Sequence, residues 1–185
     1  MTVVPLILLL LFSHPNGISS LSNGLALTPP MGWSTWNVFH CDYTEVDIMV
    51  VADILVASGL LSAGYKYLNI DDYWQAHQRD PASGMLQYNE TTFPQGMLAL
   101  SDYIHSKGLL FGIYSSSGVL TCEKYPGLWQ HESLEASLFA SWNVDFFKLD
   151  CCSQDNMQDR ATAFIRWSQA LLAFGGTSLM NGNQH

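Results

Sequence analysis

The sequence has 185 residues, 48% of them hydrophobic and 12% charged, which excludes a disordered chain and indicates a globular protein with a hydrophobic core. The net charge of −9, with only seven Lys plus Arg, argues against a nucleic-acid partner. Six Trp, eight Tyr and nine Phe instead favour a neutral polar ligand on which aromatic rings can stack.

The N-terminal segment contains one apolar run, Val3–Phe12. This run has the length of the hydrophobic part of a signal peptide and is too short to span a bilayer. We therefore predict a signal peptide over residues 1–20, with cleavage between about residues 19 and 26, where small side chains occur. No Lys or Arg precedes the run, so a buried N-terminal strand is the alternative.

Export is consistent with two further features. Asn89 begins the sequence Asn-Glu-Thr, a possible glycosylation site. The chain also has four cysteines, Cys41, Cys122, Cys151 and Cys152. Cysteines at this frequency fit an oxidising compartment, and four cysteines allow three disulfide pairings. The absence of CxxC spacing argues against a zinc site.

Strand-like and helix-like segments then alternate along the chain. Residues 30–36 lead into a predicted loop over 37–43. Strands are predicted over 64–74, 109–117, 144–150 and 177–181. Helices are predicted over 44–59, 96–108, 131–142 and 156–176. Apolar strands that alternate with helices indicate a parallel sheet covered by helices.

The first predicted helix illustrates the pattern. Thr44 is the expected N-cap, and the apolar residues recur at helical spacing. These residues are Val46, Met49, Val50, Ile54 and Leu55.

Polar and aromatic residues gather where the predicted strands end. They are Trp36, Asp71, Asp72, Tyr114, Lys148 and Asp150. In a (β/α)₈ barrel these ends form the catalytic face, and a doubly wound sheet also binds ligands there. No GxGxxG or GxxxxGKS follows a strand, which weakens the nucleotide-binding version of the doubly wound fold.

The strand Val144–Asp150 ends in a cation and a carboxylate. Side chains alternate along a strand, so Lys148 and Asp150 should face the same side. A lysine close to Asp150 would keep that carboxylate ionised, as a nucleophile or base requires. The alternative is a structural salt bridge at the end of the strand.

Asp71 and Asp72 close another strand. Two adjacent carboxylates most often lie in a solvated loop. Carboxylates beside an indole also suit a sugar, because the carboxylates accept hydrogen bonds from its hydroxyls and the indole stacks on its CH face. Trp33, Trp36 or Trp74 could supply the indole, although each alone is more often a core residue.

The histidines are less informative. His105 is expected on a helix surface or in packing, and His40 and His77 lie in loops without a visible partner. The GxSxG sequence of serine hydrolases is absent.

Five segments, in this order, resemble the N-terminal half of the α-galactosidases of glycoside hydrolase family 27. They are TPPMGWSTWNVFHC, GYKYLNIDDYW, FPQGMLALSDYIHSKGLLFGIYSSSG, TCEKYPG and DFFKLDCC. The resemblance runs from about residue 27 to the end of the chain. It implies a (β/α)₈ TIM barrel, of which residues 27–185 would form the first four to five βα units. It also implies a retaining hydrolase of α-galactosides that needs neither a metal nor another cofactor.

The same resemblance assigns roles to individual residues. Asp150 corresponds to the family's nucleophile. The residues implied in galactose binding are Asp71, Asp72, Trp36, Tyr114 and Lys148. Cys122 and Cys152 correspond to a disulfide between two loops. A secreted, lysosomal or vacuolar location and a homodimer of the full-length enzyme are also expected, with no membrane contact after signal removal.

The sequence departs from the family pattern in two respects. Many relatives have DDCW, with that cysteine bridged to the position of Cys41, whereas this chain has Tyr73. Cys41 and Cys151 are therefore expected to be free or paired with each other. The chain is also short for a barrel of roughly 250 residues. We expect an incomplete barrel without the family's acid/base residue; an α-N-acetylgalactosaminidase and a non-catalytic truncated product are the alternatives.

Overall fold

The computed structural model describes residues 28–153, 157–173 and 179–182. The predicted signal peptide lies outside these residues. Within the described ranges, no helix combines the length and apolar character that a membrane crossing requires.

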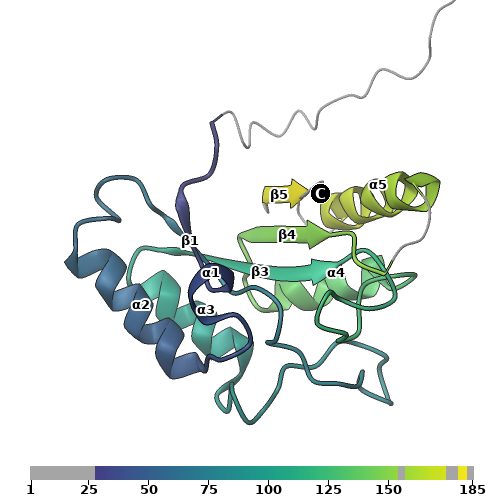
Figure 1. Cartoon of the computed structure of the whole chain (residues 1–185), viewed down its shortest axis with the longest axis horizontal. Helices are drawn as coiled ribbons and strands as arrows, with labels where there is room; N and C mark the ends of the chain where they lie inside the picture. Colours follow the sequence, from purple (N-terminus) through teal and green to yellow (C-terminus); the bar gives the residue numbers. More distant parts are fainter. Residues whose placement is uncertain (1–27, 154–156, 174–178, 183–185) are drawn as a thin grey trace, which may run out of the picture.

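One parallel sheet organises the described chain. Its strands are β1 (Gly32–Ser34), β2 (Tyr67–Asn69), β3 (Leu110–Ser116), β4 (Phe146–Asp150) and β5 (Leu179–Gly182). Each strand pairs in parallel with the next, in the order β1-β2-β3-β4-β5 (Figure 1). This order confirms the prediction of a parallel sheet built from successive strand–helix units.

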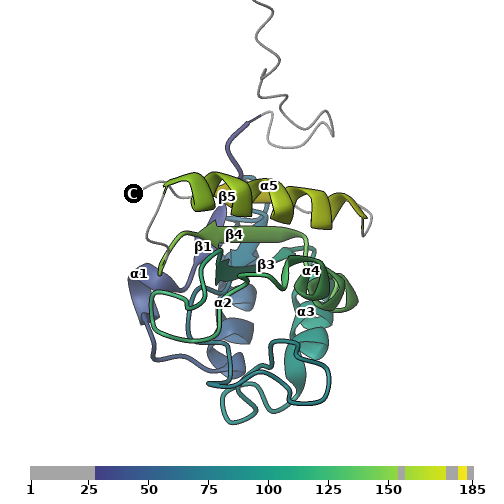
Figure 2. The same cartoon turned by 90° about the vertical axis from the view of Figure 1, so that its right-hand side faces the viewer.

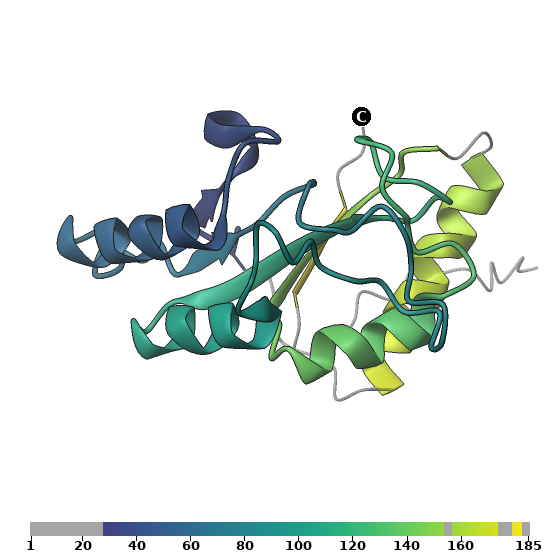
Figure 3. The ribbon, with the colours of Figure 1, turned by 90° about the horizontal axis from the view of Figure 1, so that it is seen from below.

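The helices are α1 (Trp36–Phe39), α2 (Glu45–Ala57), α3 (Gly96–Ser106), α4 (Glu132–Ser141) and α5 (Met157–Ala173). Figure 3 shows α2, α3, α4 and α5 following one another around the outside of the curved sheet. The short helix α1 replaces the start of the loop predicted over 37–43, because four residues are too few for a periodic apolar pattern to appear in the sequence.

Helix α2 begins as the sequence predicts but buries a different face. Thr44 caps it: its backbone N–H donates to Asp47 Oδ2 at 2.8 Å. However, Val46, Val50 and Ile54 are 61%, 50% and 55% exposed, whereas Ile48 is fully buried. Val46, Val50 and Ile54, which recur at helical spacing in the sequence, therefore form an exposed stripe and not the face that packs on the core. Almost the whole helix is apolar, so spacing alone does not select the buried side.

The core lies between the sheet and these outer helices. Phe147 of β4 packs on Phe139 of α4 and on Trp167 of α5, with ring centroids 5.3 and 4.6 Å apart. Figure 2 shows α4 and α5 near β4 from the side. His105 of α3 pairs with Asp145, which directly precedes β4, at 2.6 Å. His105 is thus a partly exposed residue of the helix that contacts the start of β4, consistent with the predicted surface or packing position.

The strand register brings the carboxyl ends of the strands to one edge. Tyr114 of β3 lies opposite Lys148 of β4, and Ser116 lies opposite Asp150. Because all strands are parallel, the residues that follow them reach the same mouth of the sheet.

Candidate active site

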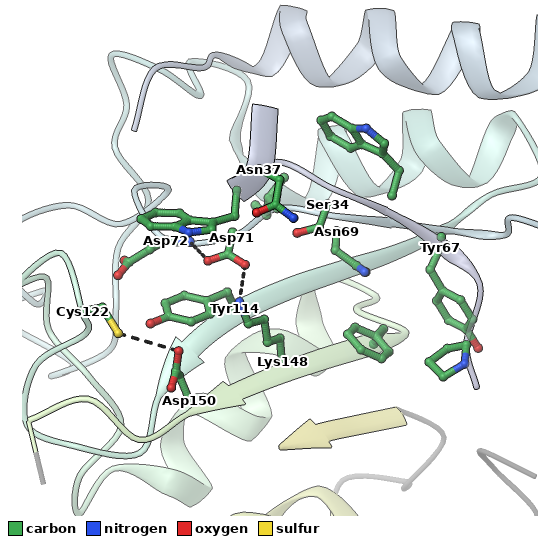
Figure 4. A pocket seen from close by; sticks show the side chains of 16 residues that line it. Ser34, Asn37, Tyr67, Asn69, Asp71, Asp72, Tyr114, Cys122, Lys148 and Asp150 are labelled. Atoms are coloured by element: carbon green, nitrogen blue, oxygen red, sulfur yellow. Dashed lines mark hydrogen bonds and ion pairs between the residues drawn. The ribbon is translucent and has the colours of Figure 1, made fainter. Parts of the chain in front are cut away.

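A cavity of about 540 Å³ opens at this edge, on the face of the sheet away from the outer helices (Figure 4). It contains all six residues that the sequence places at strand ends: Trp36, Asp71, Asp72, Tyr114, Lys148 and Asp150. The prediction from the sequence that these six side chains lie together is thus confirmed.

Asp71 and Lys148 form the charged centre of the cavity. Lys148 Nζ donates to Asp71 Oδ2 at 2.7 Å, and the backbone N–H of Asp72 donates to Asp71 Oδ1 at 2.9 Å. The Asp71 side chain is only 4% exposed, so the cation offsets much of the cost of burying its charge.

This pairing corrects the prediction that Lys148 pairs with Asp150. Residues two apart on a strand project in parallel from points about 6.6 Å apart. Lys148 instead reaches across the cavity to Asp71 at the end of β2, as Figure 4 shows. The two residues do face the same cavity, as the alternation of the strand predicts.

Asp150 is held at one oxygen and open at the other. The backbone N–H of Cys151 donates to Asp150 Oδ1 at 2.7 Å. Asp150 Oδ2 lies 3.7 Å from Cys122 Sγ. Because this sulfur belongs to a disulfide and carries no hydrogen, the second contact is not a hydrogen bond. One carboxylate oxygen therefore remains without a protein donor among the described residues.

Asp72 is more deeply tied to the backbone. Its Oδ1 accepts from Tyr73 N at 3.0 Å and its Oδ2 from Glu123 N at 2.9 Å. Burial raises the pKa of the Asp72 carboxyl, and these hydrogen bonds oppose that rise. Asp72 thus joins the loop after β2 to the loop after β3.

The aromatic residues divide between cavity and core. Trp33 and Trp36 line the cavity. Trp74 is fully buried and donates from Nε1 to the Tyr114 carbonyl at 2.8 Å, so it belongs to the core and is no stacking platform. Burial raises the pKa of Tyr114, with Asp72 and Asp150 adding to the rise, so its hydroxyl keeps its proton and can donate.

The structure joins Cys122 and Cys152 in a disulfide, with Cα atoms 5.2 Å apart. This bond links the loops after β3 and β4. Cys41 and Cys151 are free and are not paired with each other. Burial, with Glu123 and Asp72 nearby, raises the pKa of the Cys41 thiol to about 11.

Sequence reasoning missed some residues of this region. Asn69 lines the cavity, and its Oδ1 is buried without a hydrogen-bond partner in the described part of the chain. Thr35 and Tyr43 lie behind the cavity and hold the backbone at Asp71. Neither carries a charge, so only the folded arrangement reveals their contacts with the Asp71 backbone.

Comparisons with known proteins agree with this geometry. The family model described as "Alpha galactosidase A" matches residues 28–182. An α-galactosidase from Coffea arabica is 49% identical over 158 residues, which cover 85% of this chain and 41% of that protein. "Alpha-galactosidase 3" from Arabidopsis thaliana is 52% identical over 136 residues, 74% of this chain and 31% of that protein. The chain thus spans less than half the length of these relatives.

Solved structures give the same result. The α-galactosidase of Saccharomyces cerevisiae matches with a TM-score of 0.82 and 38% identity, over 86% of this chain and 36% of that one. Alpha-galactosidase I of Mortierella vinacea matches with a TM-score of 0.80 and 37% identity, over 86% and 40%. The described sheet is therefore part of a (β/α)₈ barrel, and the chain belongs to the α-galactosidase family of glycoside hydrolase family 27.

Proposed function

We propose that this chain provides the sugar-binding and nucleophilic part of a site that hydrolyses terminal α-galactosides with retention of configuration. The observation that carries the proposal is the open oxygen of Asp150, which faces a cavity whose other carboxylates are already engaged. A nucleophile needs an ionised, accessible oxygen, whereas a binding carboxylate needs a fixed position.

In this proposal Asp150 Oδ2 attacks the anomeric carbon of the galactosyl unit. The new bond between carbon and Oδ2 forms as the glycosidic C–O bond breaks, and the leaving oxygen takes a proton from a general acid. Water then attacks the anomeric carbon and gives a proton to the same acid residue, which now acts as a base. The ester C–O bond breaks and releases galactose and the Asp150 carboxylate. Cys151 N holds Asp150 Oδ1 and fixes the direction of the attacking oxygen.

The remaining cavity residues would bind the sugar. Asp71 and Asp72 would accept hydrogen bonds from galactose hydroxyls, and Lys148 and Tyr114 would donate to them. The Trp36 indole would stack on the apolar face of the ring. The name of a related structure, an α-galactosidase from Saccharomyces cerevisiae "with raffinose", supports a galactose-containing oligosaccharide as substrate class.

The proposal assigns the general acid to a carboxyl outside these 185 residues. Asp71 Oδ2 is paired with Lys148, and both oxygens of Asp72 accept backbone N–H groups. Neither is placed to protonate a leaving group. We expect the 185-residue chain alone to show little or no turnover of an aryl α-galactoside, and substantial turnover would make Asp71 or Asp72 the acid.

The decisive experiment joins residues 28–182 to the part of the Coffea arabica α-galactosidase that they do not cover. This chimera should hydrolyse an aryl α-galactoside. Asp150→Asn should lower kcat by at least about a thousandfold and leave galactose binding largely intact, because the amide keeps the shape but cannot attack.

A matched control is Asp53→Asn, which changes the same functional group on the outer surface of α2, where the Asp53 side chain is 52% exposed. It should leave kcat unchanged. An Asp150→Asn chimera that retains full turnover would overturn the assignment of the nucleophile.

We also propose that the chain is exported to a secreted or vacuolar location and glycosylated at Asn89. The Asn89 side chain is half-buried, and its Oδ1 accepts from Thr91 N at 3.0 Å. The disulfide between Cys122 and Cys152 is consistent with an oxidising compartment.

A further inference from the structure

A buried tyrosine lies directly behind the acid pair of the cavity. Tyr43, in the loop between α1 and α2, is 2% exposed. Its hydroxyl oxygen lies 2.8 Å from the Asp71 carbonyl and 3.0 Å from the Asp72 carbonyl. A single phenolic proton thus bridges two consecutive peptide carbonyls at the end of β2.

Thr35 completes this arrangement. The backbone N–H of Asp71 donates to Thr35 Oγ1 at 2.8 Å. The Asp71 peptide backbone is therefore held on both sides, by Thr35 at its N–H and by Tyr43 at its carbonyl. These hydrogen bonds form one network of three buried residues.

This network also reaches the opposite side of the cavity. Asp72 Oδ2 accepts from Glu123 N, the residue next to Cys122. Cys122 Sγ in turn lies beside Asp150 Oδ2. A shift of the Asp72 backbone would therefore be transmitted to the loop that borders Asp150.

This part of the chain also lacks the disulfide expected from the family resemblance. Position 73 is tyrosine, and Cys41 is free. The Tyr73 ring packs edge-on against the Tyr43 ring, with centroids 5.8 Å apart. Ring packing and the Tyr43 hydroxyl together connect the loop after β1 to the end of β2.

We propose that Tyr43 is a positioning residue, whose hydroxyl fixes the Asp71 and Asp72 carboxylates in the geometry that binds the sugar. This inference rests on the proposed function for its sugar-binding part. The Tyr43 hydroxyl keeps its proton and remains a donor at neutral pH, because burial, with Asp71 nearby, holds the Tyr43 pKa well above its ordinary value.

The test is Tyr43→Phe in the 185-residue chain, which removes one oxygen and keeps the ring contacts with Phe39, Tyr73 and Phe93. Amide hydrogen exchange by NMR should accelerate at Asp71 and Glu123 by about tenfold and stay unchanged in β3. Titration with methyl α-galactoside should show an affinity about tenfold weaker, because two carboxylates lose their fixed geometry.

Two controls separate positioning from stability. Tyr125→Phe removes a hydroxyl from a buried tyrosine on the loop after β3, outside this network. Ile48→Val weakens the packing of α2 without removing any hydrogen bond of the network. Both should retain the affinity of the unaltered chain. Equal losses of affinity in Tyr43→Phe and Ile48→Val would overturn the proposal.

The remaining outcomes are also decisive. Unchanged exchange at Asp71 and Glu123 in Tyr43→Phe would show that the hydroxyl holds nothing in place. Faster exchange with unaltered affinity would show a purely structural role. If the unaltered chain binds no galactoside, the proposed function fails, and the exchange measurement alone decides whether Tyr43 fixes the carboxylates.

Discussion

Lys148 links the charges of the cavity to its aromatic wall. Its Nζ lies 2.7 Å from Asp71 Oδ2 and 5.1 Å from the centroid of the Tyr114 ring. The lysine side chain is 21% exposed and the Asp71 side chain 4%. Removing the cation would leave a buried carboxylate without compensation, which is far more costly than losing an exposed pair.

Lys148→Met should therefore lower the free energy of unfolding by about 3 kcal/mol and weaken galactose binding by at least about tenfold. Adding Asp71→Asn should recover most of the stability, because a neutral amide needs no cation, but should not recover sugar binding. Urea unfolding and NMR titration measure the two effects.

Lys66→Met is the matched control, since Lys66 is exposed and precedes β2 at the opposite end of the sheet. It should change neither quantity. If Lys148→Met binds galactose as tightly as the unaltered chain, Lys148 has no part in recognition.

The sequence predicts residue positions better than residue pairings. Strand alternation placed Lys148 and Asp150 on the same side, and both line the cavity. It did not identify Asp71 as the partner of Lys148, because their ion pair joins residues 77 positions apart. The same applies to Tyr43, whose hydrogen bonds to the Asp71 and Asp72 carbonyls span 28 and 29 positions.

At the scale of elements, a buried ion pair anchors the long loop between β2 and α3. Arg79 donates to Glu135 of α4 and to the carbonyls of Gly84 and Gly127. The backbone N–H of Leu86 also donates to Glu135, at 3.1 Å. This one guanidinium therefore holds α4, the loop after β2 and the loop after β3 together.

Arg79→Met should destabilise the fold in a pH-dependent way. Burial raises the pKa of Glu135 although Arg79 opposes the rise, so removing Arg79 raises the folded-state pKa further. When the pKa of an acid is higher in the folded than in the unfolded state, the free energy of unfolding falls as the pH rises through the interval between the two pKa values. We expect Arg79→Met to lower the free energy of unfolding by about 3 kcal/mol at about pH 7 and by much less at about pH 4.

Urea unfolding at the two pH values measures this difference. Lys107→Met, which removes the partner of the exposed Asp53, is the control and should show little change at either pH. A loss in Arg79→Met that is equally large at both values would contradict the role assigned to Glu135.

The elements themselves were largely predictable. Thr44 and the apolar periodicity located α2 to α5, and Gly108, with φ of +80°, lies just beyond the end of α3. The four-residue helix α1 and the exposed stripe of Val46, Val50 and Ile54 were not predictable. Helix α1 is too short to show a periodic pattern, and the exposed stripe depends on which side of an almost wholly apolar helix meets the sheet.

For the molecule as a whole, the described strands form an open arc. Among the described residues, β1 and β5 each have one neighbour in the sheet. The arc places Asp71 and Asp72 after β2, Tyr114 on β3 and Asp150 on β4 around one cavity. Alternating strands and helices predict a parallel sheet, whereas the barrel required the family resemblance, because local patterns do not define how a sheet closes.

We propose that Asp150 is the nucleophile of the site. The most direct test is to incubate the 185-residue chain with 2-fluoro-α-galactosyl fluoride and map the product by peptide mass spectrometry. Fluoride leaves without protonation, so no general acid is needed, and the 2-fluoro group slows breakdown of the ester. We predict one fluorogalactosyl group on the peptide that contains Asp150, and none in Asp150→Asn. A label on Asp71 or Asp72, or an unlabelled chain that nevertheless binds galactose, would contradict the account.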